Sequence, residues 1–153
     1  MANHERMCSR RSVLHALGMV AAGGVAGALL DACGGTSAGA GYGNASACSG
    51  GLCVDLTDGA NAALHSVNGA LLFQASADTI LVLRTSATTF DAVSAVCTHA
   101  GCLVQPSSST ELVCNCHGSV FALGGQVLQG PAAYPLRQYA TRLSGNTLTL
   151  AGA

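Results

Sequence analysis

Two short segments carry nearly all of the reactive side chains of this 153-residue chain, and they constrain its fold more than any other feature. The first reads C-T-H-A-G-C at 97–102, and the second reads C-N-C-H-G-S at 114–119. Thiolates combined with imidazoles suit a metal of intermediate softness, either iron in a sulfide cluster or zinc. We therefore expect the two segments to meet at one metal centre.

The spacing within each segment is compatible with that expectation. Cys97 and His99 are separated by one residue, so both can face the same way in an extended loop. His117 follows Cys114 by three residues, which suits a tight turn that brings both side chains to one point. Each segment also holds a glycine where the backbone must turn or pass close to the centre. Six soft ligands thus converge from two loops, and four suffice for a metal.

The two segments resemble the cluster-binding loops of Rieske iron-sulfur proteins, specifically those of the cytochrome bc-type branch. In that family, two cysteines hold one iron of a [2Fe-2S] cluster and two histidines hold the other. The resemblance implies that Cys97 and Cys114 bind the inner iron. It implies that His99 and His117 bind the outer iron.

The resemblance also implies a disulfide between Cys102 and Cys116 that ties the two loops together. The loops have little apolar material of their own, so a covalent link would limit their freedom. Such a bond requires an oxidising compartment. Cys48 and Cys53 lie close together in the sequence, and we expect them to pair with each other in the same compartment.

Further positions match residues that surround the cluster in this family. In high-potential relatives a serine and a tyrosine donate hydrogen bonds to cluster sulfur atoms; Ser119 occupies the serine position, but Phe121 occupies the tyrosine position. Gly130 and Pro131 resemble the start of the proline loop that covers the cluster from a third side. Neutral imidazole ligands place Rieske potentials between about −150 and +300 mV. We expect a lower potential than in relatives that have both hydroxyl donors.

Residues 1–32 resemble a twin-arginine export signal that ends in a lipobox. Arg10 and Arg11 precede an uncharged run at 16–30, which is shorter than the roughly 20 residues that a membrane-spanning helix needs. The following L-D-A-C resembles a lipobox, which would make Cys33 a lipid anchor. Cleavage near Ala32 without lipidation and retention as an uncleaved anchor are the alternatives. All three predict a domain on the outer side of the cytoplasmic membrane or in the periplasm.

The chain past Cys33 has the composition of a small exported domain with a tether. Residues 33–50 are mostly Gly, Ser and Ala without periodicity, which predicts a flexible linker before a Rieske domain at 51–153. The portion after Cys33 has three arginines, five acidic residues and no lysine, so its net charge is −2. This balance excludes a nucleic-acid-binding surface.

From residue 52 onward, short β-rich runs alternate with turn residues, which predicts an all-β domain. The resemblance implies an antiparallel β sandwich or barrel as a base, with a small cluster-binding subdomain made of the two loops. The expected strands lie at 52–56, 70–75, 80–85, 90–96, 112–113 and 127–128, with a hairpin at 139–150 that turns at 144–146. The continuously apolar runs at 79–83 and 92–96 are typical of buried strands.

The function implied is one-electron transfer by an anchored carrier or by a respiratory-complex subunit of the quinol–cytochrome c reductase type. His99 and His117 are then the expected docking point for a quinol or a cytochrome-like redox partner, while His65 is expected to be a surface residue. One alternative is the small Rieske subunit of an exported oxidoreductase such as arsenite oxidase. Another is a structural zinc site built from the same four ligands. Zinc would leave the additional cysteine pair and Ser119 unexplained.

Overall fold

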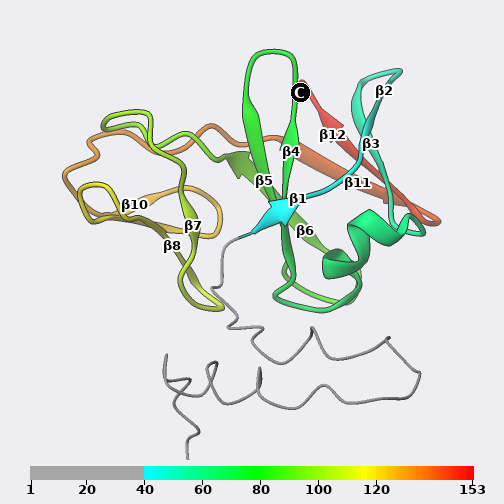
Figure 1. Ribbon diagram of the computed structural model, residues 1–153, viewed down its shortest axis with the longest axis horizontal. Helices are drawn as coiled ribbons and strands as arrows, with labels where there is room; N and C mark the ends of the chain where they lie inside the picture. Colours follow the sequence, from blue (N-terminus) through cyan, green and yellow to red (C-terminus); the bar gives the residue numbers. More distant parts are fainter. Residues whose placement is uncertain (1–39) are drawn as a thin grey trace, which may run out of the picture. The chain divides into compact units, whose positions relative to one another are not determined.

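The computed structural model describes residues 40–153. The predicted export signal, the lipobox residue Cys33 and the first part of the predicted linker lie outside the described residues. Within residues 40–153 the chain forms twelve β-strands and one short 3-10 helix, arranged in three four-stranded sheets (Figure 1). In this range no helix has the length and apolar character needed to cross a bilayer. The predicted all-β class is confirmed.

The base sheet joins the two ends of the described chain. Its strand order is β11-β12-β3-β2, and all of its pairings are antiparallel. The predicted hairpin is formed by its last two strands, and Leu148 and Leu150 are fully buried as the Thr-Leu alternation predicted. Its strands are β2 (Ser46–Cys48), β3 (Gly51–Asp55), β11 (Ala140–Ser144) and β12 (Thr147–Ala151).

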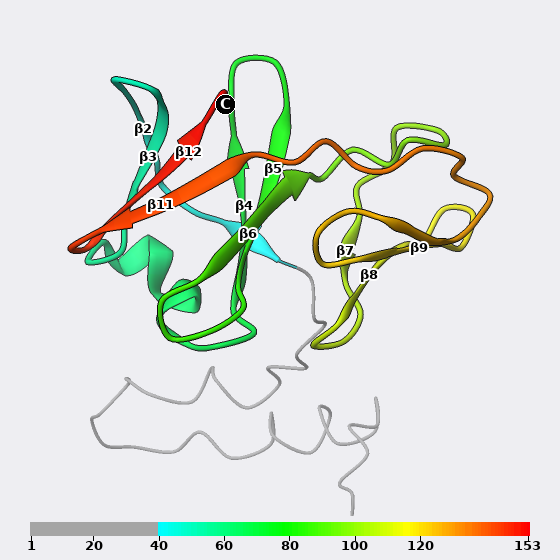
Figure 2. The ribbon, with the colours of Figure 1, turned by 180° about the vertical axis from the view of Figure 1, so that it is seen from behind.

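The middle and outer sheets complete the architecture. The middle sheet consists of β1 (Gly41–Tyr42), β4 (Ala70–Gln74), β5 (Thr79–Arg84) and β6 (Phe90–Ser94). The outer sheet consists of β7 (Gln105–Pro106), β8 (Glu111–Cys114), β9 (Ser119–Ala122) and β10 (Val127–Gln129). Figure 1 and the reverse view in Figure 2 both place the middle sheet between the base sheet and the outer sheet.

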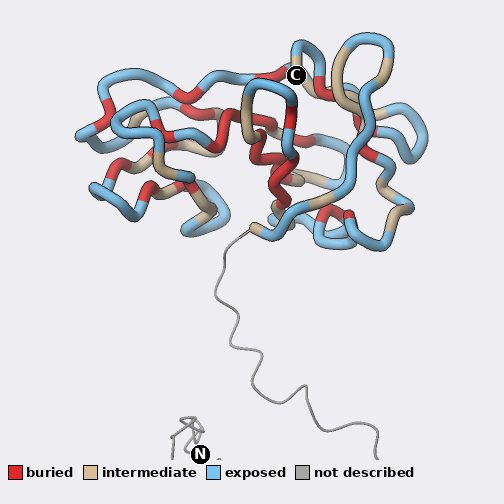
Figure 3. The backbone as a smooth tube through the Cα atoms, turned by 45° about the horizontal axis from the view of Figure 1, so that its top comes forward, coloured by how far each residue is buried: buried red, intermediate tan, exposed pale blue. Residues whose placement is uncertain are grey.

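Strand β5 contributes side chains to two hydrophobic cores, one on each face of the middle sheet. Its residues Ile80 and Val82 belong to the hydrophobic core on the base side, whereas Leu81 and Leu83 belong to the core beneath the outer sheet. Because successive side chains of a strand point to opposite faces, both faces of this strand are buried. This is why the run at 79–83 is continuously apolar. In Figure 3 the buried residues, in red, are concentrated in the inner part of the molecule.

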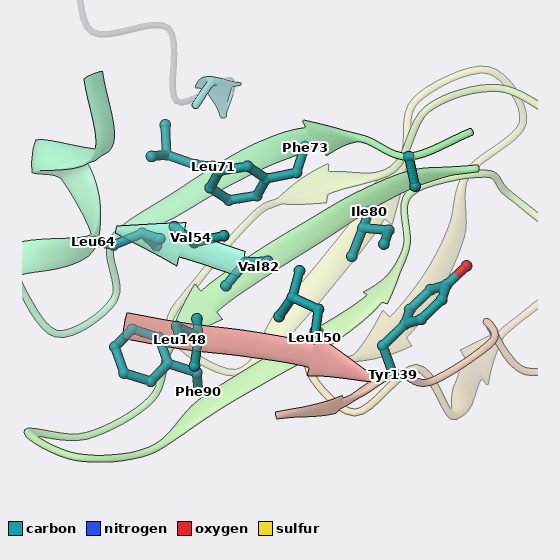
Figure 4. Packing of buried hydrophobic residues seen from close by; sticks show 12 residues of the cluster. Val54, Leu64, Leu71, Phe73, Ile80, Val82, Phe90, Tyr139, Leu148 and Leu150 are labelled. Atoms are coloured by element: carbon teal, nitrogen blue, oxygen red, sulfur yellow. The ribbon is translucent and has the colours of Figure 1, made fainter. Parts of the chain in front are cut away.

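The base core is formed by large side chains from five strands and the short helix. Phe73 and Leu71 of β4 lie opposite Leu148 and Leu150 of β12, and Leu64 of the helix closes one end (Figure 4). Full burial of a Leu or Phe side chain contributes roughly 1.5–3 kcal/mol to folding. This core fastens the base sheet to the middle sheet, and side chains on the other face of the middle sheet form the core beneath the outer sheet.

Several segments differ from the sequence predictions, and the strands β7 and β9 were not among those expected. The predicted linker at 33–50 is wrong for its last part, because β1 pairs with β4 and β2 pairs with β3. Strand β6 ends at Ser94, and Val96 is 37% exposed instead of buried. The helix η1 (Gly59–His65) was not predicted; its first turn is capped by the Asp58 side chain, which accepts a hydrogen bond from the Ala60 amide at 2.9 Å.

The segment at 41–48 is ordered by a buried asparagine of that helix. The Asn61 side chain is fully buried; it donates to the carbonyls of Asn44 and Asp55, both at 2.8 Å, and accepts from the Asn44 amide at 2.8 Å. The Cys48–Cys53 disulfide then fastens β2 to β3. A composition rich in small residues does not reveal these long-range partners, so the sequence pattern alone predicted a tether.

Candidate metal centre

The two cysteine- and histidine-containing segments form two loops that close in the same way. In the first loop, the Gly101 amide donates to the Cys97 carbonyl at 2.9 Å; in the second, the Gly118 amide donates to the Cys114 carbonyl at 2.9 Å. Both glycines have a positive φ, +76° and +77°, a conformation that costs other residues about 1–2 kcal/mol. The glycines thus let each loop turn back so that its ligands face the other loop.

The structure contains both predicted disulfides. Cys102 and Cys116 join the two loops, with their Cα atoms 6.5 Å apart. Cys48 and Cys53 are bonded in the base sheet, with a Cα separation of 5.8 Å. The first disulfide lies beside the centre, because the Cys114 sulfur is within 4.8 Å of both of its sulfur atoms. The link therefore holds the loops together at the point where their ligands meet.

Cys97 and Cys114 are the two cysteines of residues 40–153 that form no disulfide. They are 2% and 1% exposed and belong to the core beneath the outer sheet. Burial raises the pKa of the Cys97 thiol, but hydrogen bonds from the His99 and Ala100 amides and from the Cys114 and Ser119 side chains outweigh burial and lower this pKa below its ordinary value. Donors thus converge on this sulfur, as a thiolate requires.

The pKa of the Cys114 thiol shifts in the opposite direction, above its ordinary value. Burial raises the pKa of the Cys114 thiol, and the hydrogen bond that it donates to Cys97 raises it further. The amides of Cys116 and His117 act against this rise. The two thiols therefore form one coupled pair, in which Cys97 loses its proton first.

The two histidines lie on the outer side of these thiols. His99 and His117 are exposed, their ring centroids are 4.7 Å apart, and the rings meet edge to face at 83°. The four predicted ligand residues are thus divided by depth, with sulfur donors inside and nitrogen donors outside. This order matches the inner and outer iron positions that the sequence resemblance implies.

A third segment packs against the loops. The Ala132 amide donates to the buried Ser119 hydroxyl oxygen at 3.0 Å, and the Thr98 hydroxyl donates to the Tyr134 carbonyl at 2.6 Å. This segment begins with the Gly130–Pro131 peptide bond, which is cis. Residues 130–134, which we call the proline segment, therefore touch both cluster loops.

Two other residues complete the comparison with the sequence predictions. Phe121 is fully buried in β9, among the core residues beneath the loops. His65 is exposed as predicted, and a ring nitrogen contacts the Leu56 carbonyl. The sequence did not predict the contact between Thr98 and Tyr134. Any residue at position 134 offers the same backbone carbonyl, so the residue type there does not indicate the contact.

The donor set fits a binuclear cluster with mixed ligands. It offers two buried thiols, two exposed imidazoles in edge contact, and backbone amides that point at the sulfur atoms. Hydrogen bonds from such amides to sulfur are a general means by which proteins tune iron-sulfur centres. The disulfide sulfurs are already bonded to each other, so they leave Cys97 and Cys114 as the available thiolates.

Comparisons with known proteins agree with this geometry. The profile of the Rieske [2Fe-2S] domain matches residues 61–140. A cytochrome b6-f complex iron-sulfur subunit from Chlorobaculum thiosulfatiphilum is 37% identical over 83 residues, which cover 54% of this chain and 45% of that protein. The chain thus spans less than half of the length of this curated relative.

Solved structures show the same fold. The cyanobacterial plasma membrane Rieske protein PetC3 from Synechocystis PCC 6803 is similar with a TM-score of 0.50 and 36% identity, over 55% of this chain and 87% of that one. The ferredoxin of carbazole 1,9a-dioxygenase from Nocardioides aromaticivorans IC177 has a TM-score of 0.51 at 22% identity, over 57% and 88% of the two chains, and shows the fold alone. The family match favours a Rieske [2Fe-2S] cluster over a structural zinc ion. This chain belongs to the Rieske [2Fe-2S] domain family.

Proposed function

We propose that this chain transfers single electrons through a [2Fe-2S] cluster held by Cys97, His99, Cys114 and His117. The observation that carries the proposal is the division of these ligands by depth, with both thiols buried and both imidazoles exposed. When bound, the cluster accepts and releases one electron. Exposed imidazole edges give a partner its shortest approach to the centre, while the buried side keeps water away from the sulfur atoms.

The residues around the ligands have distinct tasks in this proposal. The Cys102–Cys116 bond keeps the loops in register, and Gly101 and Gly118 allow their tight turns. Ser119 supplies a hydroxyl to Cys97 and is itself held by the Ala132 amide. These contacts fix the ligands before the cluster binds, which reduces the reorganisation that electron transfer would otherwise require.

The proposed setting is the outer side of the cytoplasmic membrane. The chain would reach it through the twin-arginine signal and remain attached through a lipid on Cys33. It would act as an anchored carrier or as a subunit of a bc-type complex, and take electrons from a quinol or a redox protein. The sequence motifs at 10–11 and 30–33 support this setting, as does the similarity to cytochrome b6-f iron-sulfur subunits.

Iron and acid-labile sulfide analysis of the purified chain tests the cluster assignment. We expect about two iron and two sulfide ions per chain, as a [2Fe-2S] centre requires. Cys97→Ser and His117→Ala should each lose most of the iron. The matched control is the Cys48→Ala/Cys53→Ala double variant, which removes two cysteines outside the site and should keep it. Zinc without sulfide, or iron retained in both site variants, would overturn the assignment.

A further inference from the structure

The part of the chain that carries the cluster loops is inserted between two strands of the rest of the domain. Residues 95–138, which we call the cluster subdomain, include both loops, the outer sheet and the proline segment, and they lie between β6 and β11. The chain enters this subdomain after Ser94, the last residue of β6, and leaves it at Tyr139, directly before β11. Within residues 40–153 the cluster subdomain is therefore joined to the remaining strands by two crossings of the chain.

The two crossings lie side by side as an antiparallel bridge. The Ser94 amide donates to the Arg137 carbonyl at 2.7 Å, and the Tyr139 amide donates to the Ala92 carbonyl at 2.9 Å. Figure 2 shows the end of β6 beside the chain that leads into β11. Because these hydrogen bonds pair the two crossings, a group that contacts both of them can act on the whole subdomain.

The carboxylate of Asp78 contacts both crossings. Asp78 lies in the turn between β4 and β5, and one of its oxygens accepts hydrogen bonds from the Ser94 hydroxyl at 2.9 Å and from the Thr79 amide at 2.8 Å. Its other oxygen accepts from the Tyr139 hydroxyl at 2.6 Å. Ser94 and Tyr139 are 7% and 5% exposed, so neither hydroxyl can exchange this partner freely for bulk water.

The two hydroxyl-bearing residues extend this contact in opposite directions. The Ser94 hydroxyl oxygen accepts from the Val96 amide at 3.2 Å, so the contact reaches the residue before the first cluster loop. The ring of Tyr139 packs in the base core near Leu150 (Figure 4), with its hydroxyl group at the edge of that core. Asp78 thus connects the start of the first loop, the end of the cluster subdomain and a turn of the middle sheet.

We propose that Asp78 is a positioning residue that fixes the orientation of the cluster subdomain relative to the base sheet. The direction in which the imidazoles of His99 and His117 face is then fixed with it. This inference rests on the proposed electron transfer through these imidazoles and adds the residue that holds them in one direction. A subdomain that turned freely would present the imidazoles at many angles, and a partner would meet the productive arrangement less often.

Apolar packing alone does not supply this orientation. The cluster subdomain packs on the middle sheet through the core beneath the outer sheet. Hydrophobic burial is non-directional, whereas a hydrogen bond weakens steeply when its angle changes. The two oxygens of the Asp78 carboxylate bind one crossing each, so rotation of the subdomain about either crossing strains the bond to the other.

Pulsed EPR can measure this orientation as the distribution of distances between the reduced cluster and a nitroxide on the base sheet. The nitroxide is attached to a ketone-bearing side chain introduced at Thr147, so that cysteines are left unlabelled. Thr147 is exposed and lies in β12, which is paired with a strand on each side. We expect one narrow distribution for the full, cluster-loaded chain. Several separate distances in the otherwise unaltered chain would overturn the proposal.

Asp78→Ala removes the contacts to both crossings. It should broaden the distance distribution by about twofold or more at unchanged iron content, because packing without these directed bonds permits rotation. Asp58→Ala is the matched control. Asp58 also accepts two hydrogen bonds, from the Ala60 amide at 2.9 Å and from the Asn44 side chain at 3.1 Å, but none of these residues belongs to a crossing. Equal broadening in the two variants, or no broadening in Asp78→Ala, would overturn the proposal.

Variants that remove one contact at a time keep the test decisive if Asp78→Ala fails to fold. Ser94→Ala and Tyr139→Phe each leave the carboxylate bound to one crossing, so each should broaden the distribution, though less than the loss of both contacts. An unchanged width in both variants would contradict the positioning role.

Asp78→Asn provides the conservative rescue. Its carbonyl oxygen can accept from the Ser94 hydroxyl, and its amide group can donate to the Tyr139 oxygen, so both crossings remain bound. The distribution should stay close to that of the wild type, and a width equal to that of Asp78→Ala would contradict binding at two points. A wild-type chain that binds no cluster would instead refute the proposed function, so the two failures are distinguishable.

Discussion

The Ala132 amide donates a hydrogen bond to the Ser119 hydroxyl oxygen at 3.0 Å. Ser119 is fully buried, and its own hydroxyl group is directed to the Cys97 sulfur. One side chain of the second loop thus connects the proline segment to a ligand of the first loop. Because its oxygen accepts from a backbone amide, the hydroxyl proton remains available for donation to sulfur.

Ser119→Ala tests this orientation. A hydrogen bond to sulfur stabilises the more negative, reduced state of the centre, so its removal should lower the reduction potential. A loss of about 1.4 kcal/mol in the reduced state corresponds to about 59 mV for one electron. An EPR-monitored redox titration measures the shift. Ser86→Ala, in the loop between β5 and β6, is the control and should leave the potential unchanged. A shift as large in that variant would argue against a local effect.

Phe121→Tyr supplies the hydroxyl that this chain lacks relative to high-potential Rieske proteins. Phe121 is fully buried beneath the loops, and we expect the added hydroxyl to donate to a sulfur atom of the centre. The potential should then rise by tens of millivolts, in the same titration. Iron content must first equal that of the wild type. If the potential of the cluster-loaded variant stays constant or falls, the missing hydroxyl at position 121 does not lower the potential of this chain.

Removing the inter-loop disulfide should weaken cluster retention more than removing the base disulfide. Cys102 and Cys116 close a loop with a sequence separation of 14, for which the chain-entropy argument gives about 3 kcal/mol. The Cys102→Ala/Cys116→Ala variant should lose its visible absorbance faster on heating. The Cys48→Ala/Cys53→Ala variant, with a separation of 5, is the matched control. Equal rates of loss in the two variants would contradict a special role for the inter-loop bond.

Stability at high pH should depend on Tyr139. Burial, the hydrogen bond to Asp78 at 2.6 Å and the charge of Asp78 raise the pKa of Tyr139 from 10.0 to about 12. The folded state thus holds this proton more tightly than the unfolded state. The resulting stabilisation is complete below pH 10 and is lost as the pH rises from about 10 to 12.

Tyr139→Phe isolates this contribution. The wild type should lose free energy of unfolding between about pH 10 and 12, with an upper limit of about 3 kcal/mol for two units of pKa. The variant should show a smaller loss over that interval, although it is less stable at neutral pH without the Asp78 hydrogen bond. Chemical denaturation at several pH values measures both. Parallel pH profiles for the two proteins would rule out Tyr139 as the source.

Sequence reasoning was most successful where a pattern repeats locally. The Thr-Leu alternation at 147–150 predicted which face of β12 is buried, and the apolar run at 79–83 predicted a strand buried on both faces. It did not predict β9 or the helix at 59–65. Strand β9 lies directly after the second loop, and its four residues are too few to show a clear alternation of apolar and polar side chains. The helix has no apolar periodicity and is held instead by Asp58 and Asn61.

The site shows the same division between local and long-range information. The type and spacing of the ligand residues predicted the two loops. The family resemblance predicted the disulfide between Cys102 and Cys116. The contacts of Thr98 and Ala132 are made through backbone atoms of the proline segment, so their residue types carry no signal.

In the proposed centre, one iron of the cluster is bound by the two imidazoles of His99 and His117. Electron–nuclear double resonance of the reduced chain measures this most directly, because it detects nitrogen nuclei bound to the paramagnetic centre. We predict couplings from two imidazole nitrogens, each abolished in cells grown with ¹⁵N-histidine and replaced by the ¹⁵N pattern. A reduced centre without directly bound nitrogen, or no paramagnetic centre after reduction, would contradict the account.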